Sequence, residues 1–264
     1  MFLLAEYYTK IPDIISGKNQ GGAYFNAQLT CVLLGEYNIG AMRKTVYHGS
    51  ERVVKKPVFG FGKPYSDYGL GFYCTESLDL AKEWSVDENR DGFANCYEIE
   101  TEGLRILELE SQDFCVLHWL SALLSNREFE LDTALAADAR DYILEKFPVD
   151  TDKADIITGW RADDSYFTFA RNFLSGAITL TKLGEAMRLG KLGTQFVIKS
   201  RKAFSRIEFK EATLAKARDW FALKKGRDDE ARRIYRDMRA KRERNGLYIT
   251  KIMDEEMTAD DLRV

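Results

Sequence analysis

The sequence has little of what metal and disulfide chemistry require. Its 264 residues include only four cysteines and two histidines. The cysteines lie far apart without a CxxC pair, so neither a zinc site nor a disulfide framework is predicted. With His48 and His118 alone, His-rich metal sites are excluded and catalytic schemes built on histidine are sharply limited. We expect reduced thiols, a cytoplasmic location and no metal cofactor.

Long hydrophobic runs and prolines are also scarce. No stretch approaches the roughly 18 apolar residues of a membrane span, and residues 1–5 lack the basic flank of a signal peptide. The four prolines leave no Pro-rich linker, while 45% apolar and 31% charged residues indicate a folded globular protein. The net charge of −3 argues against nucleic-acid binding through overall charge. We therefore expect no membrane association, and any nucleic-acid contact would have to be local.

Apolar periodicity and chain breakers predict a mixed order of strands and helices. Strands are predicted at 46–48, 72–75, 94–99, 104–109, 154–159, 195–199 and 207–209, and helices at 27–34, 76–84, 114–124, 132–147, 166–171 and 181–189. Asp132 is the expected N-cap of the fourth helix, which Pro148 terminates. These elements predict an α+β fold. We divide it into an N-terminal helical segment (1–44), a core (45–210) with a helical insertion (111–147), and a charged helical extension (211–264).

Three short segments are candidates for a functional site. They are Tyr47-His48-Gly49-Ser50, the run from Asp67 to Thr75, and Gly193-Thr194-Gln195-Phe196-Val197. Each signal is weak alone, because a single histidine at a strand end is more often structural and a tyrosine in a strand is usually core. Their order along the chain makes them a recognisable set.

The three segments resemble the His-Tyr-Glu branch of the ADP-ribosyltransferases, which includes the diphtheria-toxin-like and poly(ADP-ribose)-polymerase-like enzymes. A bacterial subgroup of uncharacterised function is especially similar, with Tyr-His-Gly-Ser, Asp-Phe-Gly-x-Gly-Phe-Tyr-x-Thr and a later Ala-Asp-Asp. The similarity spans roughly residues 45–209. It implies a core of two small antiparallel-type sheets facing each other across an NAD cleft.

The resemblance also implies the activity, which is transfer of ADP-ribose from NAD to a macromolecular acceptor, either protein or nucleic acid. An effector of the bacterial toxin type or of phage defence is expected, and for a toxin an antitoxin protein is a candidate partner. Two other readings stay open. One is an inactive module that binds NAD or ADP-ribose, and the other is an NAD glycohydrolase, in which water replaces the acceptor.

The residue types in these segments suit cleavage of the bond between nicotinamide and ribose. This reaction passes through an oxocarbenium-like cation, so fixing the leaving group and stabilising positive charge both help. His48 can bind ribose hydroxyls, and Tyr73 offers a flat face on which nicotinamide can stack. Gly49 lets its backbone approach the nicotinamide carboxamide, and Ser50 is a second partner for it. The loop at 57–71 would cover the dinucleotide, with binding residues Asp67, Tyr68 and Gly71 near its end.

Gln195 occupies the third family position, where glutamate is usual. Its amide can accept a hydrogen bond from a ribose hydroxyl, yet it lacks the negative charge that stabilises the cation, and Gln195→Glu is expected to restore that charge. Asp163 and Asp164 are auxiliary candidates, equally well explained as a helix cap. Glu208 is a further carboxylate, predicted to be an exposed strand residue.

Two basic features are considered apart from these segments. Arg127, which follows a helix, could reach a phosphate or face solvent, and we favour solvent. The basic stretch at 232–244 is expected to be a solvated helix or a docking face for the acceptor.

Overall fold

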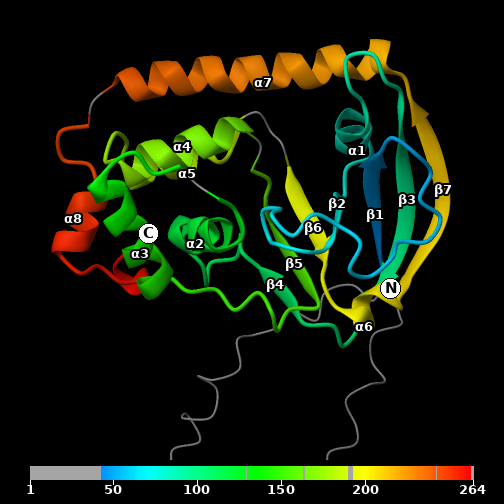
Figure 1. The fold of residues 1–264 in the computed structure, drawn as a ribbon, viewed down its shortest axis with the longest axis horizontal. Coiled ribbons are helices and arrows are strands. Elements are labelled where there is room, and N and C mark those ends of the chain that lie inside the picture. The colour runs from blue at the N-terminus through cyan, green and yellow to red at the C-terminus, as the bar shows by residue number, and fades with distance from the viewer. Residues whose placement is uncertain (1–42, 129, 163, 190–192, 242, 263–264) are drawn as a thin grey trace, which may run out of the picture. The chain divides into compact units, whose positions relative to one another are not determined.

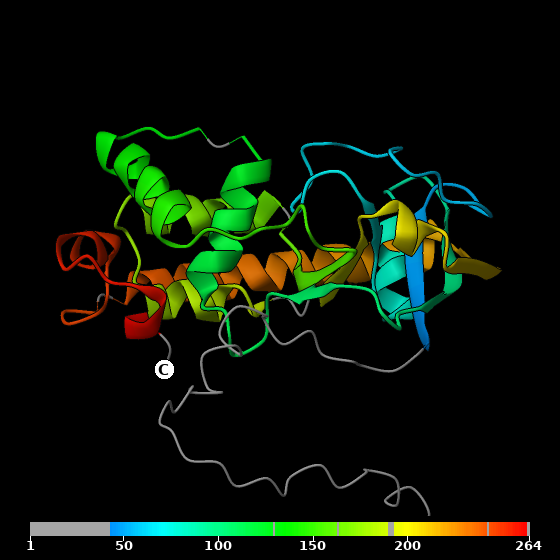
Figure 2. The same cartoon turned by 90° about the horizontal axis from the view of Figure 1, so that it is seen from below.

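The computed structural model describes residues 43–128, 130–162, 164–189, 193–241 and 243–262. These residues form a mixed α+β fold with two β-sheets, which confirms the expected fold class (Figures 1 and 2). The helix expected at 27–34 and nearly all of the segment 1–44 lie outside the described residues.

The first sheet is antiparallel and has the strand order β1-β3-β7. Its strands are β1 (Arg43–Ser50), β3 (Gly92–Glu100) and β7 (Ile207–Ala215). Side chains alternate along each strand, and Val46, Tyr97 and Ile99 lie on the buried face. β7 continues past Lys210, so the predicted boundary between core and extension falls inside a strand. The exposed residues of β7 include charged ones such as Glu211. The composition of this strand beyond Lys210 therefore resembles that of the charged extension.

The second sheet is mixed and has the strand order β2-β6-β5-β4. Its strands are β2 (Phe72–Cys74), β4 (Ile106–Glu108), β5 (Ile156–Trp160) and β6 (Thr194–Ile198). β4 and β5 are parallel, so the expectation of antiparallel-type sheets is wrong for this pair. The long helical segment between these two strands allows the crossover that a parallel pair requires.

The two sheets share a hydrophobic core. Val46 and Tyr97 from the first sheet belong to the same buried cluster as Phe72 and Phe196 from the second. The Phe72 and Tyr97 rings meet edge to face, with centroids 5.5 Å apart. Backbone hydrogen bonds between Tyr47 and Thr75 also join β1 to the end of β2. The middle of β1 is therefore fixed against the residue that follows β2.

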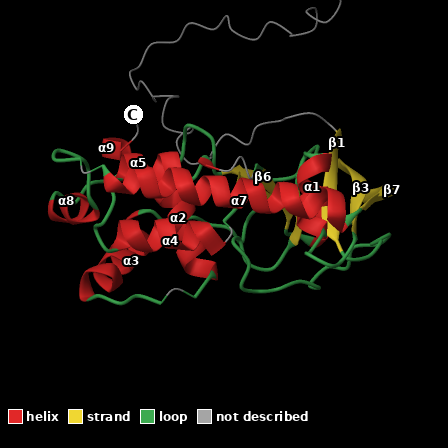
Figure 3. Ribbon diagram, turned by 90° about the horizontal axis from the view of Figure 1, so that it is seen from above, coloured by secondary structure: helices red, strands yellow, loops and turns green. Residues whose placement is uncertain are grey.

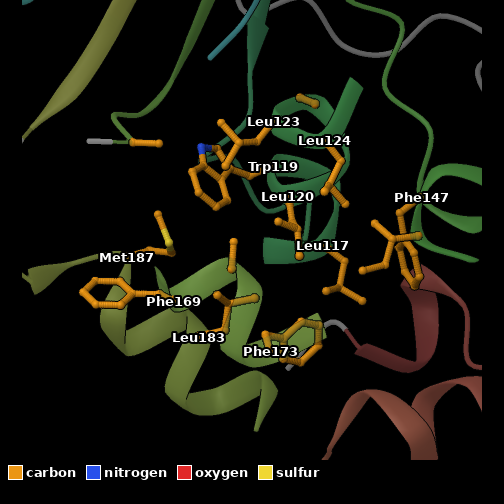
Figure 4. Close-up of a cluster of buried hydrophobic side chains, with 14 of the residues drawn as sticks. Leu117, Trp119, Leu120, Leu123, Leu124, Phe147, Phe169, Phe173, Leu183 and Met187 are labelled. Atoms are coloured by element: carbon orange, nitrogen blue, oxygen red, sulfur yellow. The ribbon is translucent and has the colours of Figure 1, made fainter. Parts of the chain in front are cut away.

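A second core lies among the helices that pack against the other face of the β2-β6-β5-β4 sheet. Its helices include α2 (Val116–Asn126), α3 (Ala134–Lys146), α4 (Asp164–Leu174) and α5 (Leu180–Ala186). Figure 4 shows Trp119 of α2, Phe173 of α4 and Leu183 of α5 in this core. Burial of such a side chain contributes about 1.5–3 kcal/mol. Thr133 caps α3, not Asp132, because its side chain accepts the Ala136 N–H.

The remaining helices flank the sheets and the helical core. They are α1 (Leu78–Ser85), α6 (Arg201–Phe204), α7 (Ala217–Ala240), α8 (Ile249–Asp254) and α9 (Ala259–Leu262). Figure 3 shows α7 running along α5 and on to α1, and both helices contact it. None of the described helices combines the length and the apolar character that a membrane crossing requires.

Candidate functional site

His48 lies against the backbone of Tyr73, where β1 meets β2. Its Nδ1 atom is 2.7 Å from the Tyr73 carbonyl oxygen. Because a carbonyl only accepts, Nδ1 carries the proton and Nε2 of the neutral ring is an acceptor. Burial lowers the pKa of His48, and the bond to Tyr73 opposes this only in part. The ring is therefore a neutral acceptor near pH 7, as a partner of ribose hydroxyls should be.

Asn95 of β3 holds the chain that leaves β1. Its Nδ2 donates to the His48 carbonyl, to Ser50 Oγ and to the Arg52 carbonyl, at 3.1–3.2 Å. Its Oδ1 accepts from the Val54 N–H at 2.9 Å. Asn95 is fully buried. Sequence reasoning missed it, since a single asparagine within a strand gives no signal of such a network.

Gly49 is required by packing between β1 and α1. A Cβ atom at this position would lie 2.2 Å from the Ala81 carbonyl oxygen and 3.0 Å from Trp84 Cβ. Real Cβ atoms essentially never approach backbone that closely. Packing therefore requires a glycine at position 49, which the sequence did not reveal. The absence of a side chain here lets Trp84 lie beside the His48-Gly49-Ser50 segment.

Tyr73 braces the loop that leads into β2. Its hydroxyl donates to the Gly69 carbonyl at 2.6 Å and accepts from the Tyr68 N–H at 3.0 Å. Burial, with a smaller effect of Asp67, raises the pKa of Tyr73 far above its ordinary range. The hydroxyl is therefore protonated at any ordinary pH and acts through these two hydrogen bonds.

Asp67 is the centre of a buried polar network. Arg127 donates to its Oδ1 from Nε at 3.0 Å and from Nη2 at 2.6 Å. Its Oδ2 accepts from the Ala162 N–H at 2.9 Å and from Gln195 Nε2 at 3.0 Å. The expectation that Arg127 faces solvent is wrong for its guanidinium, which pairs with Asp67 although the side chain remains 29% exposed. The buried Asp67 carboxylate needs a cationic partner to offset its desolvation. Asp67, only 2% exposed, positions other groups and is not available as a binding residue in this conformation.

The Asp67 carboxylate fixes the orientation of the Gln195 amide. A carboxylate only accepts, so Nε2 must face Asp67, and Oε1 faces away from it. Gln195 is 5% exposed, and its Oε1 has no hydrogen-bond partner in the described part of the chain. Leaving such a buried acceptor unpaired costs about 1–3 kcal/mol. Gln195 Oε1 is therefore an oriented acceptor on β6 that is buried in this conformation.

Two further predicted binding residues have packing roles. Tyr68 is fully buried, and its hydroxyl donates to the Trp160 carbonyl at 2.7 Å. We therefore reassign Tyr68 to the core. A Cβ atom on Gly71 would lie 2.6 Å from Val197 Cγ1, so this glycine is needed for β2 to pack beside β6.

The predicted auxiliary carboxylates lie in different places. Asp163 lies outside the described residues, and Asp164 begins α4. Glu208 is an exposed residue of β7, as the sequence predicts, and it pairs with Lys210. Glu110 was missed. Its carboxylate accepts from the hydroxyl of Thr194, which immediately precedes Gln195, and burial raises the pKa of Glu110.

A cavity of about 480 Å³ adjoins the Asp67 network. Arg127 and Ala162, both partners of Asp67, line it together with Trp84 and Arg161. The Arg161 guanidinium lies 4.5 Å from the centre of the Trp84 ring. Trp84 Nε1 is a buried donor without a partner in the described part of the chain. The unpaired donor of Trp84 thus belongs to a residue that lines this cavity, and the unpaired acceptor of Gln195 belongs to the adjoining network. Unpaired buried groups of this kind are expected where a ligand or water satisfies them.

A comparison with known protein families shows to which family the chain belongs. The sequence model of one family, described as "Protein of unknown function (DUF3990)", matches residues 44–209, which is well over half of the chain. The chain belongs to the DUF3990 family. No curated protein and no solved structure matches it.

The DUF3990 region contains both groups that lack partners. Trp84 and Gln195 lie within it, as do His48, Tyr73 and Asp67. Helix α7, which supplies the rest of the cavity wall, lies beyond its end. In the described residues, no group of three or more His, Cys, Asp or Glu side chains is arranged to hold a metal ion.

Proposed function

We propose that this DUF3990 protein is an NAD-dependent ADP-ribosyltransferase that modifies a macromolecular acceptor, protein or nucleic acid. The observation that carries the proposal is the unpaired Oε1 of Gln195, oriented by Asp67 at the position where the resembling enzymes have glutamate. The neutral His48 and the bridge between Tyr47 and Thr75, which joins β1 to the residue after β2, support it. We also propose that the two sheets form the core of an ADP-ribosyltransferase-like fold.

The proposed reaction breaks the bond between C1′ of the ribose and the nicotinamide nitrogen. The bonding electron pair leaves with nicotinamide, which departs neutral, and positive charge develops on the ribose. A nucleophilic group of the acceptor then bonds to C1′ and loses its proton. Gln195 Oε1 accepts from a ribose hydroxyl, and this contact strengthens as the ribose becomes cationic and its hydroxyls more acidic.

The negative charge that a glutamate would supply must come from elsewhere. Asp67 is largely neutralised by Arg127, which donates two hydrogen bonds to it. Glu110, which accepts from the Thr194 hydroxyl one residue before Gln195 on β6, is a carboxyl outside that ion pair. We assign Glu110 the role of stabilising the cation through its charge, in place of Glu208, which lies on the outer strand β7.

A bacterial toxin-type or phage-defence effector is the proposed setting, with an antitoxin protein as a partner if the protein is a toxin. NAD is then consumed as substrate.

The test is incubation of the full chain with NAD labelled in the adenylate half and, separately, in nicotinamide, together with bacterial lysate. Transfer predicts nicotinamide release together with label on macromolecules, which protease or nuclease treatment then assigns to protein or nucleic acid. Free nicotinamide without labelled macromolecules identifies a glycohydrolase and contradicts transfer. Binding without turnover identifies an inactive module. Gln195→Ala should slow labelling by at least roughly tenfold, and the exposed Gln112→Ala is the matched control.

A further inference from the structure

Helix α7 gives the cavity an unbalanced positive charge. Of the cavity's lining side chains, five are cationic and two are acidic, although the whole chain carries −3. Both acidic residues already have cationic partners: Glu83 bonds to Arg227 at 2.7 Å and Asp228 to Arg232 at 2.8 Å. The excess charge is therefore local to this cavity and does not reflect the composition of the chain.

The cations of α7 share one face of the helix. Lys224, Lys225 and Arg232 follow Phe221 at three, four and eleven residues, a spacing that places all four on the same side. Away from the cavity, Arg233 of α7 pairs with both Glu230 and Asp237.

Contacts with α1 hold this face in position. Arg227 of α7 donates to both carboxylate oxygens of the buried Glu83, at 2.7 and 3.1 Å. The Lys82 ammonium lies 4.6 Å from the centre of the Trp220 ring. A bidentate pair such as Arg227–Glu83 fixes the relative orientation of its two side chains and also adds stability. The cationic face of α7 is therefore held in place against α1 as one wall of the cavity.

Lys224 is half-buried in this wall. Its ammonium donates to the Val86 carbonyl at 2.9 Å and is 3.9 Å from Asp87. Burial lowers the pKa of Lys224, Asp87 raises it, and the cations Arg161 and Arg90 lower it further. A bound anion would offset both the desolvation and the repulsion.

We infer that the α7 face binds the diphosphate of a nucleotide in this cavity, through Lys224, Lys225 and Arg232 together with Arg161. This deepens the proposed function, on which the identity of the nucleotide as NAD depends. The cavity size lies within the range of small-ligand sites, and the aromatic rings of Trp84 and Phe221 offer apolar contact for a nucleoside. A nucleic-acid backbone would instead need cations spread over an open surface.

The inference assigns a role to a part of the chain outside the DUF3990 match. α7 is Ala217–Ala240, whereas the match ends at residue 209. It also departs from the expectation for the basic stretch at 232–244, because it gives a role in the NAD site to Arg232, which lines the same cavity as Arg127.

The experiment measures binding of inorganic pyrophosphate, ADP-ribose and adenosine to the full chain by calorimetry. Lys224→Gln/Lys225→Gln should weaken pyrophosphate and ADP-ribose binding by at least roughly tenfold, because two cations that contact the diphosphate are lost. Adenosine binding should stay within about twofold. The control Arg236→Gln/Arg239→Gln removes two exposed cations of α7 that do not line this cavity and should change nothing.

A charge-retaining variant separates binding from folding. Lys224→Arg/Lys225→Arg should bind pyrophosphate like the wild type. Equal pyrophosphate affinity in the wild type and the Gln double variant overturns the inference, as does binding of single-stranded RNA through these lysines without pyrophosphate binding.

The two proposals can fail independently. If pyrophosphate and ADP-ribose bind through α7 while NAD is never cleaved, the anion site stands and the enzymatic proposal fails. If NAD is cleaved with an unchanged KM in the Gln double variant, the enzymatic proposal stands and the α7 site fails.

Discussion

Gln195 Nε2 donates a hydrogen bond to Asp67 Oδ2 over 3.0 Å, deep in the protein. This contact explains an amide in a place where the resembling enzymes have a carboxylate. With Asp67 as the neighbour, a second carboxylate would face the first inside a nearly waterless site, where like charges repel strongly. The amide nitrogen donates a hydrogen bond to Asp67, and the amide oxygen is left as an acceptor for a ligand.

The first prediction follows from this pair. Sequence alone suggests that Gln195→Glu restores the missing charge and preserves or raises activity. The structure predicts the opposite: the free energy of unfolding should fall by about 1–3 kcal/mol at neutral pH, and NAD turnover should fall with it. The loss should shrink below about pH 5, where the introduced carboxyl is protonated and can donate to Asp67. Urea unfolding at the two pH values measures it.

A double variant provides the control. Asp67→Asn in the Gln195→Glu background restores a donor and an acceptor to the pair, although the Ala162 N–H loses its acceptor. Stability at neutral pH should recover in part. If Gln195→Glu alone is as stable and active as wild type, the assigned orientation of the amide is incorrect.

The second prediction concerns Arg127. Arg127→Ala leaves the Asp67 carboxylate buried beside only neutral donors and should cost about 3 kcal/mol of unfolding free energy. Arg140→Ala is the matched control, because Arg140 is an exposed arginine on α3 whose carboxylate contact is 4.0 Å. Such surface pairs contribute about 0–1 kcal/mol. Equal effects of the two substitutions in chemical denaturation would refute the central role of Asp67.

The third prediction separates two explanations of Gly49. Gly49→Ala should destabilise the protein by at least about 2 kcal/mol, because its Cβ has no room against the α1 backbone. Gly226→Ala, in α7 with open space around it, should stabilise by about 0.5–1 kcal/mol. Thermal unfolding compares them. A stable Gly49→Ala protein that merely fails to bind NAD would favour the ligand-based explanation instead.

The fourth prediction is a pH dependence that arises from His48. Its pKa is lower in the folded protein than in the unfolded chain. As the pH falls through about 6.5, the unfolded chain takes up a proton that the folded state does not, so stability falls until the lower folded pKa is reached. His48→Asn keeps a donor for the Tyr73 carbonyl but cannot titrate. It should lose less stability than wild type between about pH 7.5 and pH 5.5, and an equal loss would contradict the assignment.

Much of the fold could be predicted because its signals are local. Ser77, a residue type that favours helix N-caps, accepts the Leu80 N–H at the start of α1, and Pro148 follows the end of α3 as expected. The positions of the strands with His48, Tyr73 and Gln195 were likewise evident from alternation and glycine breaks.

The site could be predicted only in part, because its geometry depends on contacts between distant residues. Arg127 and Asp67 are 60 positions apart, and Gln195 is 128 positions from Asp67. No local pattern marks such partners. The same holds for Trp84, which the absent side chain of Gly49 brings beside β1. Short-range patterns therefore locate candidate residues, whereas long-range packing determines which of them present free polar atoms.

The most direct test of the account is the single-turnover release of nicotinamide from NAD by the wild type and by Gln195→Ala. We predict release by the wild type and a rate at least roughly tenfold lower in the variant, with an NAD dissociation constant within about twofold of wild type, because the Gln195 contact matters chiefly in the transition state. An unchanged rate in Gln195→Ala, or no nicotinamide release by the folded wild-type protein, would contradict the account.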